Sequence, residues 1–86
     1  MGNGAQKMIT YKLEYCNEKE LKYTYYPWKD TEDVGFIIAS RKGNVLQYKM
    51  TKADSPYPGY FNEMLPIACR NAESENPEKE GSMCWL

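Results

Sequence analysis

The sequence predicts an α+β fold in which an antiparallel sheet of four strands, joined as a meander, carries one helix on one face. Three observations predict it. Apolar and polar residues alternate with a period of two over much of residues 8–50, the spacing becomes helical after Asp54, and 42% of the chain is hydrophobic. A chain of 86 residues has the length of one small domain. We therefore expect a disordered tail over residues 1–7 and a single α+β domain over residues 8–86.

The first two strands follow from strict alternation. The predicted inward residues are Ile9, Tyr11, Leu13 and Tyr15 in 8–16, and Leu21, Tyr23 and Tyr25 in 21–26. The polar segment 17–20 between them is a turn, so the two runs form a hairpin. Pro27 has no N–H to donate to a ladder, and the second strand should end there.

A second hairpin is predicted from 36–40 to 45–51. The segment 41–44 is its turn, in which Gly43 or Asn44 suits a positive φ. We expect Leu46, Tyr48 and Met50 to point inward from the fourth strand. Taken together, the patterns predict a core of Tyr11, Leu13, Tyr23, Tyr25, Phe36, Ile38, Leu46, Tyr48, Phe61 and Met64.

The helix is predicted over about 58–72, where aromatic and apolar residues recur every three or four positions. Asp54 or Ser55 is the candidate N-cap. Pro66 removes one backbone hydrogen bond, so the segment is either a kinked helix or two short helices, and the sequence after it favours the kinked helix. The apolar end, 82–86, should pair as a short edge strand or pack on the helix.

Composition restricts the chemistry. Cys16, Cys69 and Cys84 are odd in number and widely spaced, and the chain has no histidine, so a disulfide framework, a Cys/His zinc site and a Cys–His catalytic pair are poor fits. Unpaired thiols indicate a reducing compartment, and no segment has the length and apolarity of a membrane helix. We therefore expect a cytoplasmic protein without a membrane partner, a cofactor, a metal site or catalytic residues.

The charged residues suggest two weaker candidate sites, one for a cation and one for nucleic acid. The net charge is −1, with nine basic and six acidic residues in 1–52 and two basic and six acidic residues in 53–86. The acidic loop Asp30, Glu32 and Asp33 could attract a hard cation, but a solvated loop explains it better. Lys12, Lys22 and Lys49 should share the sheet face opposite the core, with Arg41 and Lys42 in a turn nearby. Basic and aromatic residues on a sheet can hold single-stranded nucleic acid, although the near-neutral charge argues against it.

One family resemblance is visible. The stretch "TYYP…GFI", the following hairpin, the Tyr-containing helix and the closing "NPEKEG…W" resemble a family of small proteins of Gram-positive gut bacteria that has no assigned function. The resemblance spans about residues 11–86. That family has an aromatic residue after the terminal tryptophan, whereas Leu86 follows Trp85 here. Because the family has no assigned function, the resemblance implies no activity.

The sequence consequently predicts a protein-interaction or regulatory domain without catalytic activity. We expect another protein as the partner, with Tyr26, Trp28, Lys12, Lys22 and Lys49 as the contact residues, because exposed aromatic side chains are common anchors at interfaces. Weak binding of single-stranded nucleic acid is the alternative, and a homodimer stays open.

Overall fold

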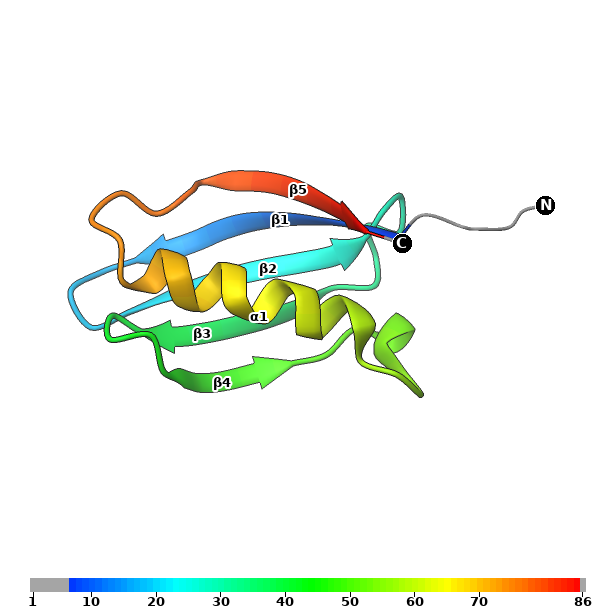
Figure 1. Ribbon diagram of the computed structural model, residues 1–86, viewed down its shortest axis with the longest axis horizontal. Coiled ribbons are helices and arrows are strands. Elements are labelled where there is room, and N and C mark those ends of the chain that lie inside the picture. The colour runs from blue at the N-terminus through cyan, green and yellow to red at the C-terminus, as the bar shows by residue number, and fades with distance from the viewer. Residues whose placement is uncertain (1–6, 86) are drawn as a thin grey trace.

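The computed structural model describes residues 7–85 and contains a five-stranded sheet with one α-helix against it (Figure 1). Its elements are β1 (Lys7–Cys16), β2 (Glu20–Pro27), β3 (Gly35–Ser40), β4 (Val45–Lys49), the short 3₁₀ helix η1 (Lys52–Asp54), α1 (Gly59–Ala72) and β5 (Glu80–Trp85). The strand order is β4-β3-β2-β1-β5, and every neighbouring pair is antiparallel. The predicted α+β class, meander and C-terminal strand are confirmed. Residues 1–6 of the predicted tail lie outside the described residues, and Lys7 already belongs to β1.

The core lies between α1 and the sheet. Its buried hydrophobic residues are Ile9, Tyr11, Leu21, Tyr23, Tyr25, Ile37, Ala39, Phe61, Met64, Ile67, Ala68 and Ala72. β1 and β2 bury the predicted residues at their centres, since Tyr11 faces Tyr25 and Leu13 faces Tyr23 across the ladder. Leu13 itself is half-buried and packs at the margin of the core. α1 runs through Pro66 as one helix, with the proline on its exposed side.

The prediction for β3 was wrong by one residue. Ile37 and Ala39 are buried, while Phe36 and Ile38 point to the other face and are half-buried. The pairing explains this, because Ile37 lies opposite Tyr23 and therefore shares its face.

Two further predictions were wrong about burial. Leu46, Tyr48 and Met50 are exposed, because β4 is the edge strand and all five of its residues remain accessible. Tyr48 does lie on the helix face as predicted, opposite Ile37 and with its ring 4.9 Å from that of Phe61. Tyr15 is exposed as well, since an irregularity in pairing between Leu13 and Tyr15 changes the face that the end of β1 presents.

The carboxylate of Asp54 is the buried polar centre of the fold. Its Oδ2 accepts hydrogen bonds from the Tyr25 hydroxyl at 3.0 Å, the Thr51 hydroxyl at 2.8 Å and the Thr51 N–H at 3.1 Å. Its Oδ1 accepts the Phe61 N–H at 2.8 Å, in the first turn of α1. Asp54 therefore joins β2, the segment after β4 and the start of α1. Burial raises the pKa of Tyr25, and the charge of Asp54 raises it further.

A second polar cluster holds the far end of α1. The Asn71 side chain accepts the Glu78 N–H at 2.8 Å, and the carboxylate of Glu78 accepts the Tyr11 hydroxyl at 2.9 Å. Burial and that hydrogen bond raise the pKa of Tyr11 to about 12. Arg41 reaches the last turn of the helix, donating from Nε to the Ala72 carbonyl at 2.8 Å.

Loss of the central carboxylate should therefore be costly. We expect Asp54→Ala to lower the free energy of unfolding by at least about 3 kcal/mol, because hydrogen bonds to a charged group contribute about 1.5–3 kcal/mol each. Asp33→Ala is the matched control, since Asp33 accepts two N–H groups from the exposed residues Lys52 and Ala53. Its cost should be about 1 kcal/mol, as for an exposed helix cap. Equal losses in urea denaturation would contradict the central role of Asp54.

Gly35 should also be sensitive to substitution, even by a single methyl group. A Cβ atom there would lie 2.6 Å from the Lys49 carbonyl oxygen and 2.8 Å from two carbons of the buried Tyr25 ring. We expect Gly35→Ala to cost about 1–3 kcal/mol through overpacking. Gly59→Ala is the control, because nothing lies within 4 Å of its Cβ position and alanine favours a helix by up to about 1 kcal/mol. The melting temperatures of both variants would test this. An unchanged melting temperature for Gly35→Ala would contradict the prediction and show that the neighbouring strands move apart at little cost.

Candidate functional site

The sheet is covered by α1 on one face, and nothing within residues 7–85 forms a second layer on the other (Figure 1). We call this second surface the open face. Its side chains alternate with the buried ones along β2 and β3. The apolar members Met8, Tyr26, Phe36 and Ile38 are all half-buried by their neighbours. The open face is therefore a mixed surface with apolar and polar groups side by side.

The predicted lysines lie on this face. Lys12 pairs with Thr24, Lys22 with Ile38 and Lys49 with Phe36. The ammonium of Lys22 lies 4.6 Å from the centroid of the Phe36 ring, which holds it against the sheet.

Carboxylates balance these charges. Glu80 lies opposite Lys12 across the β1–β5 ladder, and Glu14 accepts a hydrogen bond from the Thr24 hydroxyl at 2.8 Å. Glu20 accepts a hydrogen bond from the hydroxyl of Tyr15 on the same side of the sheet. The open face is consequently not a cationic surface, although it contains three lysines.

Trp28 is the most prominent aromatic residue beside the open face, with 55% of its surface exposed, whereas Tyr26 is half-buried. The backbone N–H of Trp28 donates to the Met8 carbonyl at 2.9 Å. In the following turn, the backbone N–H of Asp30 donates to the Pro27 carbonyl at 2.9 Å. Lys29 occupies the third position of that turn with φ 68°, a left-handed conformation that costs a residue with a side chain about 1–3 kcal/mol. Its ammonium lies 4.4 Å from the centroid of the indole ring. Trp28 is thus held in place while its ring faces solvent.

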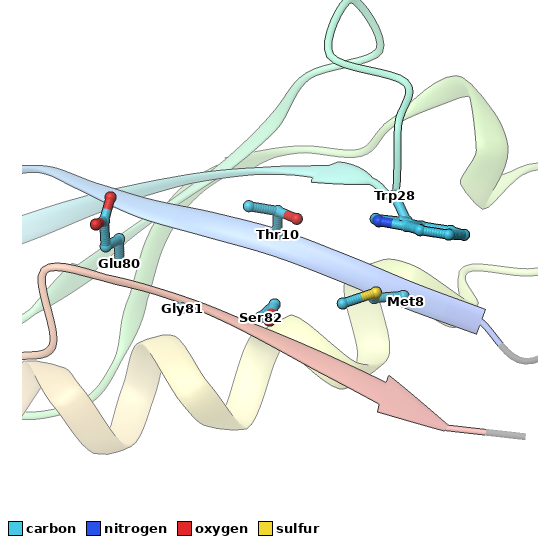
Figure 2. Close-up of a pocket in the computed structure, with 6 residues that line it drawn as sticks. All are labelled: Met8, Thr10, Trp28, Glu80, Gly81 and Ser82. Carbon is cyan, nitrogen blue, oxygen red and sulfur yellow. The ribbon is translucent and has the colours of Figure 1, made fainter.

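A shallow groove of about 310 Å³ runs beside this tryptophan (Figure 2). It is lined by Met8, Thr10, Trp28, Glu80, Gly81 and Ser82. In Figure 2 the helix lies behind the strands, Trp28 and Met8 form one end of the groove, and Glu80 lies at the other. Thr10 and Ser82 face each other across the β1–β5 ladder between these ends. The groove thus combines an apolar end, two hydroxyl groups and one carboxylate.

The other candidate residues from the sequence either have structural roles or, as with the cysteines, form no disulfide. Asp33 caps η1, and the part of the chain described here contains no cluster of three metal-ligating side chains. Arg41 donates to the backbone carbonyls of Ala72, Ser74 and Asn17, so its guanidinium is already bonded. Cys16, Cys69 and Cys84 are free thiols.

Comparisons with known proteins place no constraint on the site. No family model, curated protein or solved structure matches the chain. The resemblance to a family of small bacterial proteins stays a prediction. In the described part of the chain, no helix is both long enough and apolar enough to cross a membrane.

The groove contains residues that the sequence reasoning missed. Trp28 was predicted as a contact residue, but Met8, Thr10 and Ser82 were not. They come together because β1 pairs with β5, which lies about seventy residues later in the chain. The alternation of small polar residues with Met83 and Trp85 was the available signal, since it marks a strand with one packed face.

Proposed function

We propose that this protein is a small interaction domain without catalytic activity, which binds another protein through the groove beside Trp28. The observation that carries the proposal is the exposed indole ring, held by its own backbone hydrogen bond and by Lys29 at the end of the open face. Tryptophan dominates binding energy at many protein interfaces because it buries a large surface with few rotatable bonds. A ring held in advance also loses less entropy on binding.

The groove indicates which partner it would fit. Trp28 and Met8 would contact an apolar or aromatic side chain, and the hydroxyls of Thr10 and Ser82 can exchange hydrogen bonds with a polar group beside it. Glu80 at the other end would attract a lysine or arginine. We infer a partner segment that presents an apolar side chain close to a basic one.

The lack of an acid–base pair supports a binding role. Glu80 is the one titratable side chain among the six that line the groove, and the chain has no histidine to activate the hydroxyls of Thr10 or Ser82. Contact with a partner requires no such group.

Affinity capture from the native host tests this proposal. We expect the wild-type protein to retain a partner that Trp28→Ala loses almost completely, because a central tryptophan contributes about 2–4 kcal/mol to binding. Glu80→Lys should weaken retention through repulsion of the basic residue. Quantitative mass spectrometry of the retained proteins is the measurement.

Tyr57→Ala is the matched control for that experiment. Tyr57 is 81% exposed and does not line the groove, so the variant should retain the partner as the wild type does. Equal retention by the wild type and Trp28→Ala would contradict the proposed site. Circular dichroism would establish that each variant is folded.

Single-stranded nucleic acid is the second candidate ligand, because Lys12, Lys22 and Lys49 share the open face with Tyr26 and Phe36. We expect no appreciable binding of a fluorescent oligonucleotide even at about 50 mM salt, since nearby carboxylates offset the lysines. Binding that weakens steeply with salt, and that disappears when the three lysines are replaced by glutamate, would reverse the order of the two candidates.

A further inference from the structure

The edge strand β5 directs part of its backbone away from the sheet (Figure 1). In an antiparallel pair, alternate residues point their N–H and C=O groups at the neighbouring strand, and the residues between point theirs away from it. The Leu13 N–H donates to the Lys79 carbonyl at 2.7 Å, so Lys79 and every second residue after it face β1. Glu80, Ser82 and Cys84 therefore point their N–H and C=O groups outward, where residues 7–85 contain no further strand. We call these outward groups the β5 edge.

The β5 edge is regular, whereas the opposite edge of the sheet is not. Soluble proteins commonly protect edge strands with bulges, prolines or charged side chains. On β4 the pairing with β3 skips Leu46, and such a bulge interrupts the regular backbone. β5 pairs with β1 over six successive residues without a shift, and it contains no proline and one charged residue, Glu80. The backbone of β5 is consequently suited to pair with another strand.

We propose that the partner segment adds to β5 as a further extended strand, with its backbone paired to the β5 edge and one side chain in the groove beside Trp28. This binding mode rests on the proposed function, since it concerns the partner of the same groove. In strand addition, main-chain hydrogen bonds provide affinity and pockets for alternate side chains provide specificity. The edge and the groove are continuous, because Glu80 and Ser82 belong to both.

The charge along β5 indicates what the added strand carries. Residues 73–80 contain four glutamates and one lysine, and all four glutamates are exposed. Glu80 ends this acidic segment and lies at one end of the groove (Figure 2). Residues 81–85 carry no charge. A complementary strand therefore has lysine or arginine where it passes Glu80 and uncharged residues along the rest of β5.

The side chains beside the edge indicate the pattern of the added strand, since its own side chains alternate between the two faces of the sheet. On the open face, the small side chain of Ser82 lets a long apolar side chain cross β5 toward Met8 and Trp28. On the face that α1 covers, Met83 and Trp85 are half-buried and can be covered further by an apolar residue. The partner segment is therefore a strand rich in apolar residues with a basic residue at one end.

Binding of synthetic peptides, measured by isothermal titration calorimetry, tests the proposal. The probe is a peptide of about eight residues that alternates valine with threonine and has tryptophan at one end and lysine at the other, made in both sequence directions. Two derivatives keep every side chain and carry N-methyl groups on alternate amides, one derivative for each edge of the extended peptide. We expect methylation of one edge to weaken binding at least tenfold, because those donors pair with β5, and methylation of the other edge to leave it unchanged. Equal effects of the two derivatives, or no binding of either probe up to about 1 mM, would overturn the proposal.

Substitution of Ser82 separates its backbone from its side chain. Ser82→Pro removes an outward N–H, and an edge strand accommodates proline where the N–H faces solvent. This variant should bind the probe at least tenfold more weakly, whereas Ser82→Ala, which keeps the N–H and loses only the hydroxyl, should retain most of the affinity. Circular dichroism would establish that both variants are folded. Equal affinity of folded Ser82→Pro and the wild type would contradict strand addition.

Hydrogen exchange of the wild type gives a readout that depends on no variant. The amides of Glu80, Ser82 and Cys84 should exchange at least tenfold more slowly when the probe is bound. Slowing that requires only a higher protein concentration, without the probe, would assign the β5 edge to a second copy and overturn the proposal. Binding that Trp28→Ala abolishes, with no protection of these amides in the wild type, would also overturn it and leave the groove as the site. Protection that persists in Trp28→Ala with unchanged affinity would instead support strand addition and contradict the groove.

Discussion

The buried carboxylate of Asp54 sets the geometry on which the helix and the sheet depend. A charge inside a protein is stable only when several donors surround it, and here they come from three separate parts of the chain. Tyr25 contributes from the middle of the sheet, Thr51 from the exit of β4 and Phe61 from the first turn of α1. Because the Tyr25 hydroxyl and the Phe61 N–H bond to the two oxygens of one carboxylate, α1 has little freedom to slide along the sheet. The same carboxylate satisfies a backbone donor that the start of a helix leaves unpaired.

Tyrosine and glycine together explain how a short chain fills its core. Tyr25 lies against Gly35 on the next strand, and Tyr11 lies against Gly81 on the strand at its other side. In both cases the glycine leaves room for an aromatic ring that covers the neighbouring strand. Each hydroxyl then reaches a carboxylate, the buried Asp54 for Tyr25 and the exposed Glu78 for Tyr11. Large rings can therefore be buried without leaving their polar ends unpaired.

Much of this fold was predictable because β1 and β2 alternate strictly, and alternation determines which side chains share a face. The run "FIIAS" has apolar residues at successive positions, so its pattern allows either register of β3. The observed register places Gly35 opposite Tyr25 and Ile37 opposite Tyr23, and it leaves room for the Tyr25 ring beside the glycine, which the pattern of β3 alone does not reveal. The pattern of β4 was read correctly as a strand, but burial depends on whether the helix extends over it. The lysines could be assigned to one face from their spacing, whereas the groove requires knowledge that β1 pairs with β5.

The pairing of β1 with β5 has a consequence for the order of folding. The intervening residues must be arranged before Thr10 can meet Ser82, and contacts between segments so far apart in sequence form late because loop closure costs entropy. Hairpins such as β1–β2 involve neighbouring residues and can form early. The side of the groove formed by β1 and Trp28 is therefore expected early in folding, and the side formed by β5 is expected late. A fragment ending before residue 80 could keep Trp28 and both hairpins, yet it would contain no groove at all.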